Sequence, residues 1–175
     1  MAVRRVRPEE HEALGALTVA AYRALLGEHM DGAYAAELAD VARRAALVDV
    51  LVEVDDGGRL LGGVTYIPGP GPMAWFTDAG DAGMRMLAVD PAAQGRGVGA
   101  RLVEACVDRA VAAGKRRVLL HTTAPMTAAH RLYGRAGFLR HPEGDRTLEN
   151  EVILLAYALD LGGRVRGTRP GGGTG

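Results

Sequence analysis

The sequence predicts an α/β (α+β) fold, in which a mixed, mostly antiparallel central sheet of six to seven strands is flanked by about four helices. Three observations lead to this prediction. Two β-rich runs, at 47–54 and 60–67, are joined by the hairpin signal Asp55-Asp56-Gly57-Gly58. Residues 84–122 then follow the order strand, glycine-rich loop, helix, strand, which is typical of a parallel pair. Apolar residues at helical spacing before and after these segments supply the flanking helices.

Composition limits the class of protein. The chain has 175 residues, of which 48% are hydrophobic, so it can bury one sizeable core. We expect a single domain over 1–161 and a flexible Gly/Arg-rich tail over 162–175, which has too few apolar residues to offset the entropy lost on ordering. The 21 basic and 21 acidic residues balance, so no general affinity for nucleic acids or anionic membranes is expected.

The sequence also indicates the cellular compartment. No apolar run approaches the roughly 18 residues of a membrane span, and the N-terminal arginines are not followed by an apolar stretch. Cys106 is the only cysteine and lies on the apolar face of a predicted helix, so it is expected to pack in the core rather than react. We therefore expect a soluble, cytoplasmic protein.

The N-terminal part is expected to form a strand and two helices. Residues 2–7 alternate valines with arginines, which suits a short strand. An apolar stripe from Leu14 to Leu25 predicts the first helix, and a second is expected over about 33–46. The break between them, 27–32, is either the rim of a substrate site or a solvated connection. Its polar residues are Glu28, His29 and Asp31.

A long irregular connection is expected after the hairpin. The run Pro68-Gly69-Pro70-Gly71-Pro72 excludes regular structure, and together with Met73 to Gly83 it makes a loop of a length that is often functional. Two aromatic residues, Trp75 and Phe76, lie within it. They either form a lid or pocket wall or plug the core, and the sequence leaves both interpretations open.

The centre of the chain is the loop Gln94-Gly95-Arg96-Gly97-Val98-Gly99-Ala100, between the predicted strands Met84–Val89 and Arg117–Thr122. Three glycines at alternate positions let backbone N–H groups turn toward an anion that a β-carbon would keep away. The start of the following helix adds unpaired donors and the positive end of its dipole. A phosphate or pyrophosphate is therefore the expected ligand.

A last helix and two strands are expected in the C-terminal part. The helix begins near Met126 and ends at Gly137, with Tyr133 on its apolar face. A strand starts at Phe138, and the apolar run 152–159 closes the sheet after a polar turn.

Three other interpretations of the glycine loop fit less well. A nucleoside-triphosphatase P-loop requires Lys and then Ser or Thr after its last glycine, whereas Ala100-Arg101 follow Gly99. A dinucleotide fingerprint matches by letter, but residues 90–94 separate the strand from the first glycine, and the next strand ends without an acidic residue for the ribose. An ordinary glycine-rich turn gives no reason for three glycines together.

Two motifs resemble those of one family. Leu87-Ala88-Val89-Asp90-Pro91 followed by Gln94-Gly95-Arg96-Gly97-Val98-Gly99 resembles the acetyl-coenzyme A signature, Q/R-x-x-G-x-G/A, of the GNAT superfamily of N-acetyltransferases. Residues 129–138 resemble the second motif of that family, and the order of elements agrees over about 3–160. The resemblance implies a GNAT-like acyl-CoA N-acyltransferase fold and transfer of the acetyl group of acetyl-CoA to a primary amine in a ternary complex, without a metal.

The resemblance also implies which residues bind the coenzyme. The pyrophosphate is expected on the backbone of the glycine loop, where Arg96 supplies charge, and pantetheine is expected to pair with the strand before the loop. The thioester then lies where the two central strands separate. The implied coenzyme-binding residues are Leu87, Ala88, Val89, Gln94, Gly95, Arg96, Gly97, Val98, Gly99 and Ala100.

Acetyl transfer requires a proton donor and a proton acceptor. Tyr133 matches the tyrosine of the family that donates to the departing thiolate, although its apolar neighbours also suit a core residue. Many relatives carry a glutamate base where this chain has Asp81-Ala82-Gly83, so Asp81 and His121 are the candidate bases. A backbone N–H of Leu87 or Val89 is expected to stabilise the oxyanion.

The sequence leaves other functions open. A non-catalytic module that binds or senses acyl-CoA is the alternative, because the base is undetermined and Met126 replaces an asparagine common in the family. A nucleotide-linked oxidoreductase would require NAD. We expect a small-molecule or peptide amine as partner, and dimers among relatives make a homodimer an option. Acidic residues that can attract such an amine are Glu28, Asp31, Asp78 and Asp81.

Overall fold

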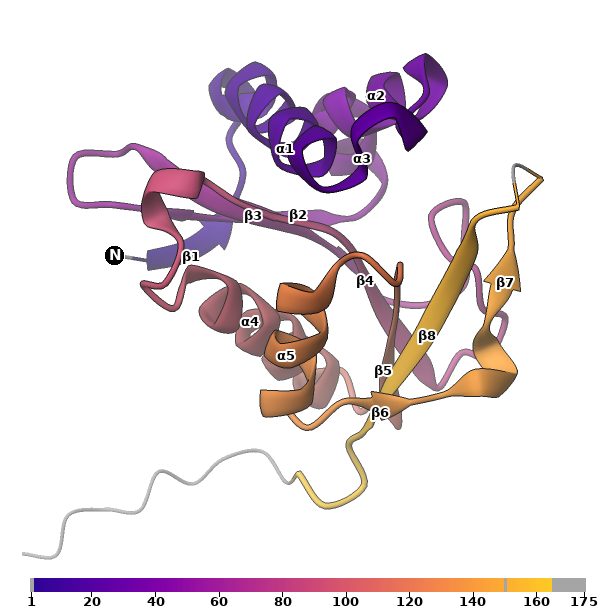
Figure 1. Ribbon diagram of the computed structural model, residues 1–175. Coiled ribbons are helices and arrows are strands. Elements are labelled where there is room, and N and C mark those ends of the chain that lie inside the picture. Colours follow the sequence, from indigo (N-terminus) through magenta and orange to yellow (C-terminus); the bar gives the residue numbers. More distant parts are fainter. Residues whose placement is uncertain (1, 150, 165–175) are drawn as a thin grey trace, which may run out of the picture.

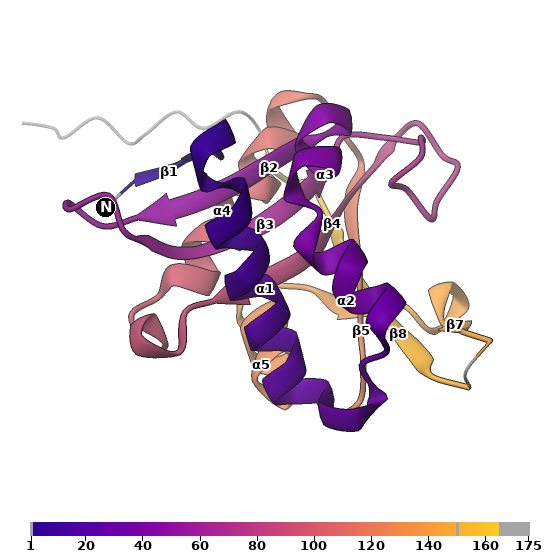
Figure 2. The same ribbon diagram turned by 90° about the horizontal axis from the view of Figure 1, so that it is seen from above.

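The computed structural model describes residues 2–149 and 151–164. One twisted sheet runs through the molecule, and helices cover both of its faces (Figure 1). One face carries α1 (His11–Leu26), α2 (Gly32–Ala39) and α3 (Val41–Leu47), and the other carries α4 (Val98–Ala112) and α5 (Thr127–Arg135). Figure 2 shows α1, α2 and α3 lying across the strands when the molecule is seen from above. None of the helices in the described ranges has both the length and the apolar character that crossing a membrane demands.

Over the described residues the sheet has eight strands in the order β1-β2-β3-β4-β5-β8-β6, and β7 also pairs with β8. Only β4 and β5 run parallel there, and the other paired strands are antiparallel. The strands are β1 (Ala2–Arg5), β2 (Asp49–Val54), β3 (Leu60–Ile67), β4 (Asp81–Val89), β5 (Arg117–Thr122), β6 (Leu139–Arg140), β7 (Arg146–Thr147) and β8 (Ile153–Asp160).

The predicted fold class is confirmed, and the unit of strand, glycine loop, helix and strand lies where the sequence places it. The predicted strand at Phe138 is the short β6, and β7, within the predicted polar turn, brings the sheet of the described chain to eight strands instead of six or seven. The expected second helix is divided into α2 and α3 at Asp40, because the Asp40 carboxylate accepts a hydrogen bond from the N–H of Arg43 and begins a new helix.

Two further expectations concern segment limits. The strand predicted from Met84 begins at Asp81, since Asp81 already pairs with Arg117 of β5, so the irregular connection is shorter than predicted. The flexible tail was predicted over 162–175, and its residues 165–175 lie outside the described part of the chain.

Cys106 is fully buried, as predicted, and burial raises its pKa to about 12, which keeps the thiol protonated.

Both faces of the N-terminal half of the sheet are buried. Leu102, Val103 and other residues of α4 pack against one face, and Leu14 of α1 belongs to the apolar cluster on the other. This is why β2 and β3 consist of nearly continuous buried residues instead of alternating buried and exposed ones. The rigid two-sided core holds β4, on which the functional site depends, in a fixed position.

β4 carries a bulge that opens the sheet. Met86 and Leu87 together face the single residue Val64 of β3, and Met86 has a φ of +55°, which residues other than glycine rarely adopt. β4 and β5 pair only over 81–83 and 117–119 and then separate. Their carboxyl ends therefore form a fork, defined here as the gap between β4 beyond residue 83 and β5 beyond residue 119. Ligands of open sheets bind at such ends.

Candidate active site

The glycine loop makes a left-handed turn directly before α4. Gly95 and Gly97 have φ values of +75° and +78°, so these two positions need glycine for their backbone conformation. Gly99 has another reason, because a β-carbon there would lie 3.1 Å from a leucine Cδ2 atom of α5. The N–H of Arg101 bonds to the carbonyl of Gly97 at 3.0 Å, so the N–H groups of 98–100 precede the hydrogen-bonded helix. The loop and the helix start therefore present backbone donors, as a pyrophosphate requires.

Arg101 ties the glycine loop to the sheet. Its Nε donates to Oε1 of Glu53 at 2.9 Å, and its Nη2 donates to the carbonyl oxygen of Arg96 at 2.9 Å. Glu53 belongs to β2 and is only 1% exposed, so its negative charge depends on Arg101 for compensation. Arg96 itself is exposed, which leaves its side chain accessible to a ligand.

The backbone of β4 beyond the fork has one unpaired edge. From Met84 to Val89 the strand pairs with β3, whereas its parallel pairing with β5 ends at Gly83. Ala88 is buried, and Leu87 and Val89 are half-buried. An extended ligand can hydrogen-bond to this edge as an added strand.

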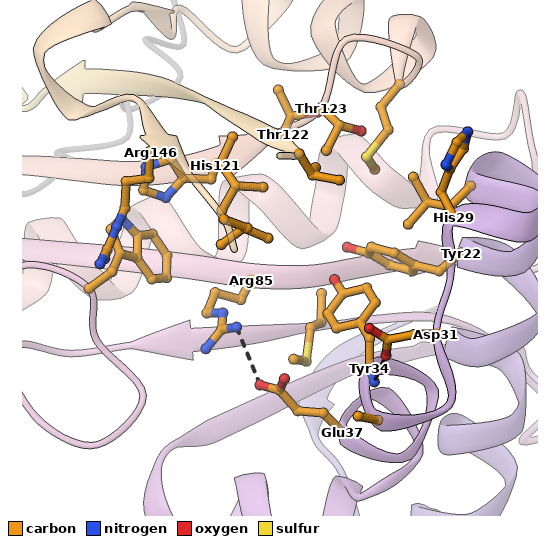
Figure 3. Close-up of a pocket in the computed structure, with 18 of the residues that line it drawn as sticks. Tyr22, His29, Asp31, Tyr34, Glu37, Arg85, His121, Thr122, Thr123 and Arg146 are labelled. Carbon is orange, nitrogen blue, oxygen red and sulfur yellow. Dashed lines mark hydrogen bonds and ion pairs between the residues drawn. The ribbon is translucent and has the colours of Figure 1, made fainter. Parts of the chain in front are cut away.

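A pocket of about 580 Å³, called here the fork pocket, lies between α1, α2 and the ends of β4 and β5. Figure 3 shows the hydroxyl groups of Tyr22 and Tyr34 directed into it. Thr122 and Thr123 line it from the end of β5, and each has a buried hydroxyl oxygen that finds no hydrogen-bond partner among the described residues. Because buried polar atoms are rarely left unpaired, these two hydroxyls are available to a polar ligand or to water.

The bulge in β4 turns two successive side chains into the fork pocket. Neighbours in a regular strand point to opposite faces, yet Arg85 and Met86 both line this pocket. Arg85 donates to Oε1 of Glu37 at 3.3 Å, and its guanidinium carbon lies 5.6 Å from the centre of the Trp75 ring (Figure 3). Trp75 lines the pocket as well, so its interpretation as a pocket wall is confirmed.

The break between α1 and α2 forms part of the pocket rim. His29 and Asp31 line the pocket, whereas Glu28 does not. Asp31 also begins α2, since its Oδ1 accepts a hydrogen bond from the N–H of Tyr34 at 2.7 Å. At the other end of this helix the buried Arg44 donates to two carbonyl oxygens. Both ends of α2 are thus fixed, and with them the side chains that this helix contributes to the pocket.

Tyr133 lies in α5 on the opposite face of the sheet. It is 5% exposed, and the centre of its ring lies 5.9 Å from that of Phe138 and 6.3 Å from that of Tyr157. Burial raises the pKa of Tyr133, so the phenol is protonated at physiological pH. It does not line the fork pocket. Tyr133 is therefore a core residue whose hydroxyl group is protonated.

His121 lines both the fork pocket and a neighbouring pocket of about 380 Å³. Its Nε2 lies 2.7 Å from the carbonyl oxygen of Gly144, and because a carbonyl only accepts, Nε2 carries the proton and donates. Nδ1 then holds the lone pair. Burial lowers the pKa of His121, the bond to Gly144 offsets part of this effect, and Arg146 and Arg85 lower the pKa further. At neutral pH the imidazole is uncharged, as a general base must be.

Asp81 lies at the other end of the parallel pair. It is 1% exposed, and its two carboxylate oxygens accept hydrogen bonds of 2.8 and 3.0 Å from Arg117. Asp81 lines the smaller pocket together with His121, and it does not line the fork pocket. Its carboxylate is therefore committed to an ion pair within the sheet.

Sequence reasoning missed several residues of the fork pocket. They are Tyr22, Tyr34, Glu37, Arg85, Thr122, Thr123 and Arg146. They share no common sequence signal, because some lie at strand ends, such as Thr122, whereas others lie within a helix or a strand, such as Tyr22 and Arg85. Of the acidic residues expected to attract an amine, Asp31 lines the fork pocket, while Asp78 pairs with Arg116 outside it. Within the described ranges, no three His, Cys, Asp or Glu side chains group together as metal ligands.

The comparison with family models identifies the chain. Residues 12–138 match the model described as the acetyltransferase (GNAT) family, which includes the bulged strand, the glycine loop and α5. This chain belongs to the GNAT acetyltransferase family. The predicted resemblance is therefore confirmed. A comparison with curated protein sequences finds no match.

Solved structures show the same GNAT fold. An acetyltransferase of the GNAT family from Staphylococcus aureus Mu50 matches with a TM-score of 0.73 at 13% identity, covering 91% of this chain and 98% of its own. A GCN5-related N-acetyltransferase from Kribbella flavida matches with a TM-score of 0.65 at 26% identity, covering 91% and 97%. A putative acetyltransferase from Salmonella typhimurium, solved with its cofactor acetyl-CoA, matches with a TM-score of 0.63 at 22% identity, covering 92% and 94%.

Proposed function

We propose that this GNAT protein transfers the acetyl group of acetyl-CoA to a primary amine by direct attack in a ternary complex. The observation that carries the proposal is the arrangement along β4. The same strand lines the fork pocket through Arg85 and Met86, and it leads directly into a glycine loop that presents backbone donors. Family membership and the relative solved with acetyl-CoA support this choice of cosubstrate.

The coenzyme occupies the loop and the free edge of β4 in this proposal. Its pyrophosphate accepts from the N–H groups of the loop and of the first turn of α4, and Arg96 adds charge. Its pantetheine pairs with the edge of β4, which brings the thioester to the fork. The residues assigned to the coenzyme are Leu87, Ala88, Val89, Gln94, Gly95, Arg96, Gly97, Val98, Gly99 and Ala100.

The acceptor enters from the fork pocket, on the face of the sheet opposite α5. Its neutral nitrogen attacks the thioester carbonyl carbon, and the backbone N–H of Leu87, beside the bulge, stabilises the oxyanion. The tetrahedral intermediate then collapses as the C–S bond breaks. The N–C bond remains, and the products are the acetamide and coenzyme A.

Two protons must move in this reaction. We assign removal of the amine proton to Nδ1 of His121, because the bond from Nε2 to Gly144 leaves the Nδ1 lone pair available and the imidazole is uncharged. We assign protonation of the departing thiolate to Tyr133. Its phenol is protonated at physiological pH and it lies on the α5 face, away from the acceptor pocket.

A release assay for free coenzyme A over a broad panel of amines tests the proposal. We expect turnover with acetyl-CoA, and we expect Tyr133→Phe to lower kcat by about 10²–10⁴ while acetyl-CoA affinity stays within twofold. Tyr157→Phe is the matched control, since it removes a hydroxyl from the adjacent ring. Binding of acetyl-CoA without product from any amine would favour a non-catalytic binding module, and absence of binding would reject the proposed function altogether.

A further inference from the structure

The charged side chains that line the fork pocket are unevenly placed within it. Its charged residues are Asp31, Glu37, Arg85 and Arg146. Arg85 pairs with Glu37, whereas Arg146 makes no ion pair with any carboxylate of the described chain. The acidic neighbour of Arg146 in sequence, Asp145, is engaged by Arg140 at 2.7 Å. Arg146 is thus an exposed guanidinium at the pocket wall that no carboxylate of the described residues neutralises.

The strand pairing brings Arg146 close to the fork. Arg146 pairs with Leu154 of β8, and the next residue, Leu155, pairs with Thr122 at the end of β5. Two strand spacings of about 4.8 Å each place the Arg146 backbone roughly 10 Å from β5. The side chain of Arg146 lines the fork pocket together with Thr122. Figure 3 shows Arg146, His121 and Arg85 on one side of the pocket and Asp31 on the opposite side.

This wall has the chemistry of an oxyanion site. A guanidinium presents a planar fork of donors that matches a carboxylate, and Arg85 and Trp75 lie on the same side of the pocket as a second cation and an aromatic face. His121 beside them is uncharged at neutral pH, so the positive charge of this wall comes from the two arginines. Across the pocket, the Asp31 carboxylate attracts a cationic amine as it enters.

We infer that the acceptor is a zwitterionic amine whose carboxylate, a few bonds from the reacting nitrogen, is bound by Arg146 with Arg85. This inference rests on the proposed acetyltransferase function and names its substrate class. Binding the carboxylate at this wall holds the nitrogen toward the fork, where Met86 and Thr122 line the pocket. An amine without the carboxylate loses the charge-assisted hydrogen bonds to this guanidinium and should be a poorer acceptor.

Matched acceptors test the inference. For each carbon skeleton in a panel of amino acids, the free acid, its amide, its decarboxylated amine and the corresponding aminophosphonate are compared by kcat/KM. In the wild type we expect kcat/KM for the acid to exceed kcat/KM for the amide and for the amine by at least about tenfold. In Arg146→Gln we expect this ratio to be less than about threefold. Arg43→Gln is the control, because Arg43 is an exposed α3 residue outside the pocket, and it should keep the wild-type ratio. If kcat/KM for the aminophosphonate equals kcat/KM for the acid, the substrate class includes amines that carry other oxyanions.

Two outcomes overturn the inference without affecting the proposed function. One is ready acetylation of amides and plain amines with no preference for the acid. The other is an acid preference that Arg146→Gln leaves unchanged. If no acceptor turns over, calorimetry measures the binding of N-acetyl amino acids and of their amides to the protein–coenzyme A complex. We expect the acids to bind more tightly than the amides, and we expect Arg146→Gln to abolish this difference. Equal binding of acids and amides to the wild type refutes the inference. Failure to bind acetyl-CoA at all would instead refute the proposed function.

Discussion

The pair of Glu53 and Arg101 offers the sharpest test of how the glycine loop is held. Arg101→Met removes the cation that faces the buried Glu53 carboxylate and the donor to the carbonyl oxygen of Arg96. Breaking a fully buried ion pair costs about 3–5 kcal/mol. The Arg101 side chain is 38% exposed, so solvent screens part of this charge, and we expect a loss of about 2 kcal/mol in the free energy of unfolding. For a chain of this size that loss lowers Tm by about 4–8 °C.

Stability and loop geometry can be separated with a second substitution. The double variant Glu53→Gln, Arg101→Met removes the uncompensated charge, so it should regain much of the lost stability. It should not regain acetyl-CoA affinity, which we expect to fall about five- to tenfold in both variants because the carbonyl of Arg96 loses its anchor. Urea unfolding measures the first quantity, and isothermal titration calorimetry measures the second.

The matched control lies on the same helix. Arg109 is two turns further along α4 and pairs with Asp49 at 3.4 Å, but both side chains are partly exposed. Arg109→Met should therefore cost less than about 1 kcal/mol and leave acetyl-CoA affinity unchanged. If Arg101→Met is as stable as Arg109→Met, or binds acetyl-CoA as tightly as the wild type, then Arg101 does not hold the loop and the reasoning is refuted.

Three further predictions concern single residues. Because the pKa of His121 is lowered, its uncharged form persists below pH 6.5. The acid limb of the pH profile of kcat/KM should therefore lie below pH 6.5 and should vanish in His121→Gln. An identical acid limb in both proteins would exclude His121 as the base. Asp81→Asn should destabilise the fold by about 2 kcal/mol in urea unfolding, since Arg117 loses its partner, and a kcat reduced by more than tenfold would return Asp81 to the mechanism. Gly134→Ala should raise the free energy of unfolding by about 0.4–1 kcal/mol, because a β-carbon there meets no atom within 4 Å and alanine favours the helix; a loss of stability would contradict this.

Local sequence signals located the elements of the fold correctly. The hairpin turn, the glycine loop and the helix after it each depend on neighbouring residues, so their positions follow from backbone preferences and apolar periodicity. Division of the second helix at Asp40 was missed, because an aspartate inside an apolar stripe looks the same whether it faces solvent or caps a new helix. The start of β4 at Asp81 was missed because an acidic residue is not expected in a buried strand unless its ion-pair partner, here Arg117, is known.

The sequence alone determined the family, the fold class and the position of the glycine loop, because each depends on motifs of residues that are close in the chain. Only the tertiary structure decided which charged groups meet at the fork. It paired Asp81 with Arg117, oriented His121 through Gly144 and brought Arg85 and Arg146 to one wall of the pocket. The bulge at Met86 and the pairing of β7 with β8 produce these placements. Both depend on strand partners distant in sequence, which no local pattern of residues encodes.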